Sequence, residues 1–179
     1  MGWSRIQKKV GTQLIAYANT ILHSLDSRLW LLFAIATALI WLPVLIRKRR
    51  AYAMRGVITY ALLILMVTLF SREGTHQRPP ELLPFWSWVK VFRHRNWELL
   101  YQIILNVLLF FPLGALLCCC KWIRKTTHPL LTIWLIGLGF SACIEVSQLL
   151  FHLGLFEWDD MIHNSLGCFL GGLAVLILW

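Results

Sequence analysis

The 179-residue chain is 59% hydrophobic and only 14% charged, whereas soluble domains carry about a quarter charged residues. This composition excludes an ordinary soluble domain and is typical of a polytopic membrane protein. The net charge of +9 does not indicate nucleic-acid binding, because the basic residues form short loops between apolar segments. All five cysteines lie in apolar segments, so we expect no disulfide framework.

The first predicted element is an amphipathic helix over residues 5–28. Its apolar residues recur at steps of three and four between Ile6 and Leu25. We expect this helix to lie along the membrane surface with its basic residues near lipid head groups, although packing against the other helices would give the same pattern. The chain then divides into an N-terminal helix, residues 1–28, and a transmembrane region, residues 29–179.

Apolar runs in the second region predict an all-α protein with about five transmembrane helices. They cover residues 29–46, 51–71, 101–120, 129–151 and 161–179. The segment over 73–100 is too polar to span and is interpreted as a loop, whose tryptophans suit the membrane interface. Pro112 and Gly114 predict a kink in the third span.

Charges in the short loops predict the orientation. Residues 47–55 and 121–128 carry five and three basic residues and no acid, while residues 152–160 carry three acids and no Lys or Arg. The positive-inside rule then places both basic loops in the cytoplasm. In this orientation the N-terminus is extracytoplasmic and the C-terminus is cytoplasmic, which leaves the basic residues before residue 29 on the disfavoured side.

A carboxylate inside an apolar run marks the candidate site. Glu145 follows sixteen uncharged residues that begin at Pro129, and Ser141 and Gln148 share its helix face. An isolated carboxylate in hydrocarbon costs at least about 2.5–3.5 kcal/mol. Glu145 must therefore be protonated, paired or turned towards a wet protein interior.

The predicted topology brings polar groups from four spans to one membrane face. The second span ends there and the fifth span begins there, with an i, i+4 pair that small residues continue along the same helix face. The predicted functional cluster comprises Arg72, Asn106, Glu145, Gln148, Asp159, Asp160 and Asn164. Helix packing is the role expected of Gly114, Gly167 and Gly171.

Several interpretations of these polar groups stay open. Arg72 is the expected cationic partner of Glu145 or of the acidic pair that begins at Asp159, but the acids could instead share a proton or bind a hard cation. Structural roles are the alternative, with Asn, Gln and Ser joining helices and Asp159 capping a helix. We expect no metal site, because His152 and His163 lack a ligand spacing, and no cofactor.

Three blocks of sequence resemble the VanZ-like family, small bacterial membrane proteins named for a member associated with teicoplanin resistance. They are NVLLFFPLG over 106–114, SACIEVSQ over 141–148 and EWDDMIHNSLGCFLGG over 157–172. Many members have an Asp where this chain has Glu157 and an Arg near Leu155, which puts charge pairing in that loop in doubt. The resemblance implies a cell-membrane protein of Gram-positive-type bacteria and supplies no established reaction.

Three functions fit these observations. The first is a non-catalytic envelope protein that binds membrane lipids and an amphiphilic ligand, either a lipid-linked wall precursor or the glycopeptide itself, assisted by the basic aromatic residues 85–97. The second is an intramembrane enzyme with Glu145 or Asp160 as general acid or base, which is less favoured because no nucleophile spacing accompanies them. The third is a proton-coupled carrier with Glu145 as the titrating group.

Overall fold

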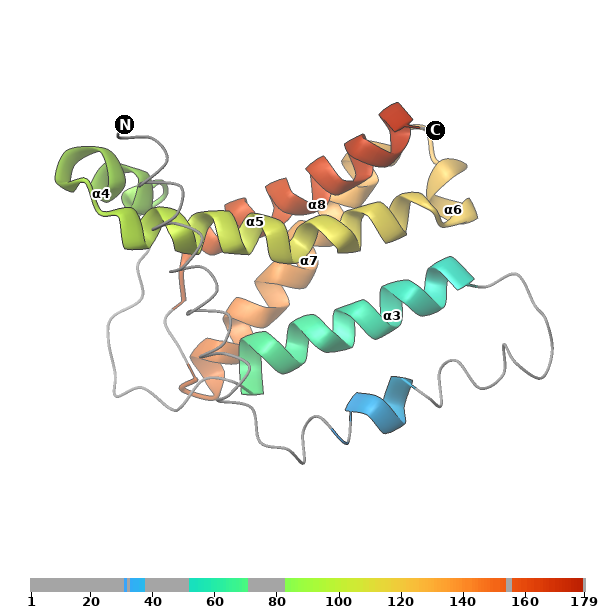
Figure 1. The fold of residues 1–179 in the computed structure, drawn as a ribbon, viewed down its shortest axis with the longest axis horizontal. Coiled ribbons are helices and arrows are strands. Elements are labelled where there is room, and N and C mark those ends of the chain that lie inside the picture. The colour runs from blue at the N-terminus through green and yellow to red at the C-terminus, as the bar shows by residue number, and fades with distance from the viewer. Residues whose placement is uncertain (1–30, 32, 38–51, 71–82, 154–155, 179) are drawn as a thin grey trace, which may run out of the picture.

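The computed structural model of the chain describes residues 31, 33–37, 52–70, 83–153 and 156–178 (Figure 1). The predicted N-terminal amphipathic helix, most of the first predicted span and Arg72 lie outside the described residues. The predicted boundary between the N-terminal helix and the transmembrane region therefore stays a prediction.

The described part of the chain is built from helices. In chain order these are α3 (Tyr52–Leu65), the π-helical turn η1 (Met66–Phe70), α4 (Trp86–His94), α5 (Trp97–Cys118), α6 (Lys121–Arg124), α7 (Pro129–Leu150) and α8 (Trp158–Leu178). Within these residues, four helical segments are long and apolar enough to cross a membrane: Tyr52–Leu69, Trp97–Cys118, Pro129–Leu150 and Trp158–Leu178. The predicted class, an all-α polytopic membrane protein, is confirmed.

Two spans begin earlier than the apolar runs predict, for local reasons. α5 starts at Trp97 rather than at Tyr101, because the Asn96 side chain accepts the Leu99 N–H at 3.2 Å and caps the helix. α8 starts at Trp158 rather than at Met161, which places two acids in its first turn, where the helix dipole favours negative charge. α5 stays helical through Pro112, and the kink stays a prediction.

The segment predicted as one loop over 73–100 contains the nine-residue helix α4. Its sequence, WSWVKVFRH, mixes tryptophan, aliphatic and basic residues, so the segment is short and polar enough to be taken for a loop. The residues that flank it, Phe85 and Arg95, adopt left-handed conformations with φ of 63° and 49°. These turns separate α4 from the chain before it and from α5 after it.

α8 packs against both α5 and α7, and these two helices also contact each other (Figure 1). Towards α5 the two backbones touch: a Cβ atom built on Gly114 would lie 1.8 Å from the Cys168 carbonyl oxygen, and one on Gly167 would lie 2.2 Å from the Val107 carbonyl oxygen. Glycine is required at such positions because any side chain would collide with backbone atoms. Two parallel helices are thereby held in one register.

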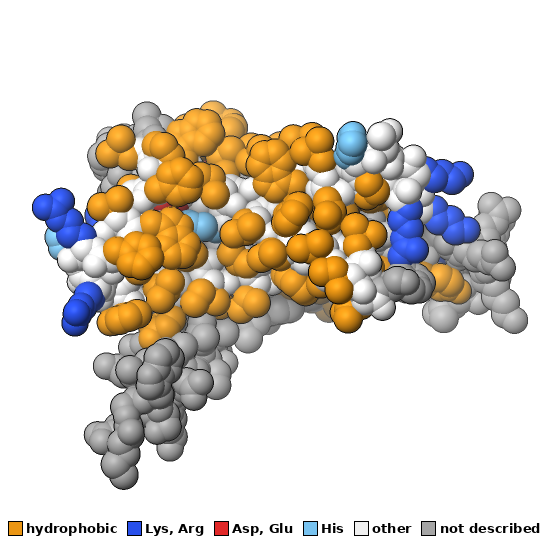
Figure 2. All heavy atoms as spheres, turned by 90° about the horizontal axis from the view of Figure 1, so that it is seen from above, with side chains coloured by type: hydrophobic (Ala, Val, Ile, Leu, Met, Phe, Trp, Pro, Cys, Tyr) orange, Lys and Arg blue, Asp and Glu red, His pale blue; other side chains and the backbone are white. Residues whose placement is uncertain are grey.

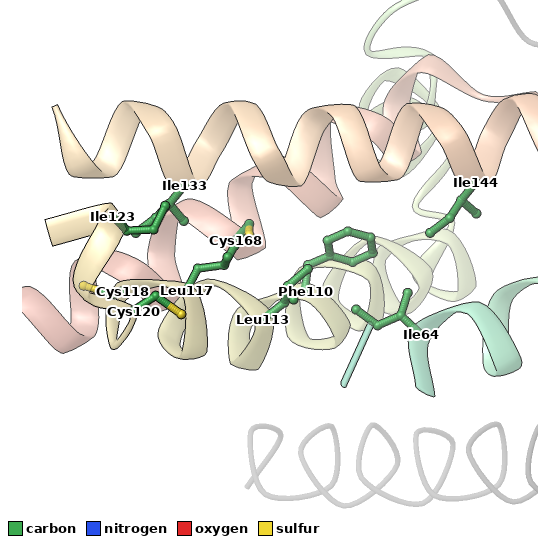
Figure 3. Close-up of a cluster of buried hydrophobic side chains, with 10 residues drawn as sticks. All are labelled: Ile64, Phe110, Leu113, Leu117, Cys118, Cys120, Ile123, Ile133, Ile144 and Cys168. Carbon is green, nitrogen blue, oxygen red and sulfur yellow. The ribbon is translucent and has the colours of Figure 1, made fainter. Parts of the chain in front are cut away.

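A cluster of buried apolar side chains fills the space between the helices (Figure 3). Its members are Ile64, Phe110, Leu113, Leu117, Cys118, Cys120, Ile123, Ile133, Ile144 and Cys168. They come from α3, α5, α6, α7, α8 and the α5–α6 turn, so one core joins the described spans. On the face seen in Figure 2, hydrophobic side chains cover the length of the molecule and Lys and Arg gather at its two ends, as expected for a membrane-spanning bundle.

We expect Gly171→Ala to destabilise the protein, because the new Cβ would lie 1.9 Å from the Phe111 carbonyl oxygen of α5. Overpacking of this kind typically costs about 1–3 kcal/mol, visible as a lower Tm in detergent. The matched control is Gly139→Ala on α7, where the added Cβ meets nothing within 4 Å. There the better helix propensity of alanine leaves Tm unchanged or raises it. Equal Tm values for the two variants would contradict the backbone contact.

Candidate functional site

Helix α8 carries polar residues on two faces of its first turns. Asp160 and Asn164 are four residues apart and share one face, while Asp159 and His163 share the neighbouring face. Asp159, His163 and Asn164 are each buried despite their polarity. The two faces bond to different parts of the molecule.

The first face joins α8 to α5 and to α7 by side-chain hydrogen bonds. Asn106 on α5 donates from Nδ2 to Oδ1 of Asp160 at 2.7 Å. Asn164 donates from Nδ2 to the Ser141 hydroxyl of α7 at 2.8 Å. A hydrogen bond to a carboxylate is stronger than one between neutral groups, so the α5 contact anchors the start of α8.

A row of buried polar side chains follows one face of α7. Ser141, Glu145 and Gln148 are 0%, 2% and 1% exposed, respectively. Oε2 of Glu145 accepts the backbone N–H of Glu157 at 2.9 Å, so this carboxyl holds the segment that leads into α8. The Gln148 amide donates to the carbonyl oxygen of Thr68 at 3.1 Å. α7 is thereby bonded both to the segment that precedes α8 and to η1, at the end of α3.

The turn that receives Gln148 is the π-helical turn η1, which the sequence did not predict. The Thr68 hydroxyl donates to the Ile64 carbonyl oxygen at 2.8 Å, a bond to the preceding turn that tends to bend a helix. π-Helical turns inside helices are common at functional sites because they displace backbone groups from the regular ladder. Here the carbonyl oxygen of Thr68 accepts a bond from another span.

These bonds connect four elements at one end of the bundle, which is the end where α7 finishes and α8 begins (Figure 1). We call the connected set the polar layer: Thr68, Asn106, Ser141, Glu145, Gln148, Asp160 and Asn164. The structure thus brings together every predicted site residue that it describes, with the exception of Asp159. Arg72 lies outside the described residues, so its pairing with an acid stays a prediction.

Asp159 departs from the cluster and bonds to α4. Its Oδ2 accepts the Ser87 backbone N–H at 2.8 Å and also the Ser87 hydroxyl, while its Oδ1 accepts the Phe85 N–H. Phe85, the residue before α4, offers no side-chain cap of its own. Asp159 therefore caps α4 from a distant part of the chain, satisfying N–H groups that a helix start leaves open. The adjacent acids Asp159 and Asp160 bond to different helices.

His163 adds a further hydrogen bond between α8 and α4. The indole Nε1–H of Trp88 donates to Nε2 of His163 at 2.9 Å. Because Nε2 accepts, the proton of the neutral imidazole is on Nδ1. We call the five residues Phe85, Ser87, Trp88, Asp159 and His163 the α4 junction.

Three polar atoms beside these bonds are buried without a hydrogen-bond partner among the described residues. They are Nε1 of Trp86, Nδ1 of His163 and Oδ1 of Asn164. The part of the chain that the structure describes contains no group of three His, Cys, Asp or Glu residues placed to hold a metal ion.

The sequence reasoning missed the α4 junction. The four-residue spacing of Asp159 and His163 could have shown that they share a helix face. Their partners could not be found in this way, because Ser87 and Trp88 lie in a segment interpreted as loop and Asp159 reaches backbone N–H groups more than 70 residues away. A backbone donor leaves no signature in the sequence.

Comparison with known proteins found one family match. A family model described as VanZ/LLP1 matches residues 57–179, which include the whole polar layer and the α4 junction. No curated protein and no solved structure matches the chain.

We expect Asp159→Ala to release α4 from α8, because three hydrogen-bond donors at the start of α4 would lose their acceptor. Leaving buried donors unsatisfied costs about 1–3 kcal/mol. Hydrogen exchange measured by mass spectrometry should show faster exchange of the amides of residues 86–94. The control is Glu98→Ala, which removes an exposed acid from the start of α5. Unchanged exchange in the Asp159 variant would refute the cap.

Proposed function

The chain belongs to the VanZ/LLP1 family and is a multi-pass membrane protein, and from this premise we propose that it lowers susceptibility to teicoplanin-type glycopeptides by binding an amphiphilic ligand at the polar layer. The ligand class is a lipid-linked cell-wall precursor or the glycopeptide itself. In this proposal the protein binds and does not catalyse.

The burial of Glu145 is the observation that carries this proposal. Its carboxyl lies in a 22-residue apolar helix and is only 2% exposed. Carboxylates in membranes are expensive and mark ligand or ion sites more often than they serve as simple fasteners. Apolar side chains of similar volume would often join the helices with equal or better stability. A polar layer of this kind is therefore better explained by a ligand than by stability alone.

The depth of the layer fits a molecule with both polar and apolar parts. Glu145 is six residues from Phe151, which corresponds to about 9 Å along the helix axis. This depth lies just below the head-group region, where the polar part of an amphiphile meets its acyl or apolar part. The hydrophobic sides of the spans offer a surface for the apolar part.

The test is the teicoplanin inhibitory concentration of a susceptible bacterial host that expresses the protein. Expression should raise it, and Glu145→Gln should abolish the rise, because the amide keeps an oxygen that can accept the Glu157 N–H but cannot ionise. Glu98→Gln, which changes an exposed acid in the same way, should retain the effect.

Protein levels must be equal for all three strains. A rise that persists in the Glu145 variant would overturn the role of this carboxyl, and no rise with the unaltered chain would overturn the proposed function itself.

We also propose that the end carrying α4 and the polar layer faces outwards, where wall precursors and glycopeptides occur. The basic residues of α6 and of the turn after it lie at the opposite end of the bundle. The positive-inside rule favours the cytoplasm for that end. Cys119 lies beside α6 and is exposed, whereas Cys120 is buried and burial raises the pKa of its thiol. Cys119 is therefore the natural aqueous reporter of that end.

In intact cells, a membrane-impermeant maleimide should leave the unaltered protein unlabelled and should label a Lys90→Cys variant on α4. After the cells are opened, both proteins should be labelled, because Cys119 then becomes accessible. Labelling of the unaltered protein in intact cells, through Cys119, would invert the orientation.

A further inference from the structure

α4 presents three stripes of side chains with different chemistry. Ser87 and Val91 are buried and form the docked stripe. Phe85, Val89 and Phe92 form an exposed apolar stripe, and Phe92 is 77% exposed. The third stripe is basic and exposed, with Lys90 and Arg93 on α4 and Arg95 directly after it. The apolar and basic stripes cover no core within the described structure.

The location of α4 indicates which environment these stripes face. α4 lies at one end of the bundle, where it leads into the span α5 (Figure 1). Seen over the surface, hydrophobic side chains cover the middle of the molecule and basic side chains gather at the ends, one of them the α4 end (Figure 2). The helix therefore lies at the level where the apolar surface of the spans gives way to charge, which is the level of lipid head groups.

The α4 junction fixes the direction in which the stripes point. Asp159 holds the start of the helix and His163 holds Trp88, so α4 cannot turn about its axis without breaking these bonds. Lys90 is further placed by its ammonium group, which lies 4.3 Å from the centroid of the Trp86 ring. The exposed stripes are thus presented by a helix that is already formed and docked.

We propose that α4 is an interfacial helix that binds the phosphate head groups of anionic phospholipids, with Phe92 and Val89 in the acyl boundary and Lys90, Arg93 and Arg95 on the phosphates. Helices with one apolar and one basic face lie in the membrane interface in this way. The charge is complementary, since residues 83–97 contain no Asp or Glu. Along the sequence the next acid is the exposed Glu98, and Asp159 is buried against the start of α4, so the exposed basic stripe keeps an excess of positive charge.

A second copy of this chain is a poorer occupant of the same surface. Pairing α4 with α4 would bring two sets of cations together in the interface, and like charges in such a position oppose association. Anionic lipids neutralise the same cations and accept the apolar stripe at the same time. This inference goes beyond the proposed function, because it concerns bulk membrane lipid and needs neither a wall precursor nor a glycopeptide.

The experiment is photo-crosslinking from the apolar stripe. Phe92 is replaced with p-benzoylphenylalanine in the full chain, which is reconstituted in lipid nanodiscs of equal phosphatidylglycerol and phosphatidylcholine. Phe92 is mostly exposed and stacks on Trp88 of the same helix, a ring contact that the aromatic replacement can retain. After irradiation, mass spectrometry should find lipid adducts enriched in phosphatidylglycerol over the bilayer ratio, by roughly five-fold for one engaged cation.

Removing the cations gives the decisive comparison. In the crosslinking background, Lys90→Gln with Arg93→Gln should return the adducts to the bilayer ratio, whereas Lys121→Gln with Lys125→Gln at the opposite end should leave the enrichment intact. Hydrogen exchange of residues 86–94 confirms that α4 stays docked in each variant. Adducts at the bilayer ratio in the starting protein, enrichment that survives loss of Lys90 and Arg93, or crosslinks mainly to a second copy would each overturn the proposal.

Discussion

The backbone contact between α5 and α8 is the constraint on which the rest of the structure depends. Glycines on both helices remove the side chains that would keep them apart, and carbonyl oxygens of one helix occupy the space in which a Cβ of the other would lie. Close approach strengthens van der Waals packing, which replaces the hydrophobic effect as the force that joins helices in lipid. It also fixes the register, so that Asn106 faces Asp160 at the end where the polar layer forms.

The polar layer is a consequence of that register and of the matching face of α7. Small residues also bring α7 close to α8: a Cβ on Gly137 would lie 2.6 Å from the Cys168 Cβ. With the helices at this distance, short side chains suffice for a direct bond between Ser141 and Asn164. Longer separations would require water or larger side chains to satisfy the same groups. Glycine packing in the middle of the spans and hydrogen bonding at their ends therefore depend on one another.

The sequence predicted the features whose signal is local. Apolar runs are long and bounded by basic loops, so the class and most span limits followed from them. The convergence of Asn106, Glu145 and Asn164 followed from span direction and helix periodicity. The cap that Asp159 supplies to α4 could not be predicted, because a backbone N–H carries no residue identity and the partners lie more than 70 residues apart. The π-helical turn η1 was equally hidden, because its sequence, MVTLF, simply continues the apolar run of α3.

The two polar faces of α8 diverge from a single turn, and this has a mechanical consequence. Asp159 and Asp160 are adjacent, yet one holds α4 and the other holds α5 beside the polar layer. A helix turn is rigid compared with the loops that flank it, because its backbone hydrogen bonds restrict every dihedral. The same few residues in the first turn of α8 therefore fix both the position of α4 and the geometry of the polar layer. A shift of α8 would move both together, whereas a change confined to the loop before α4 would have to break the Asp159 bonds before it could move α4 relative to α8.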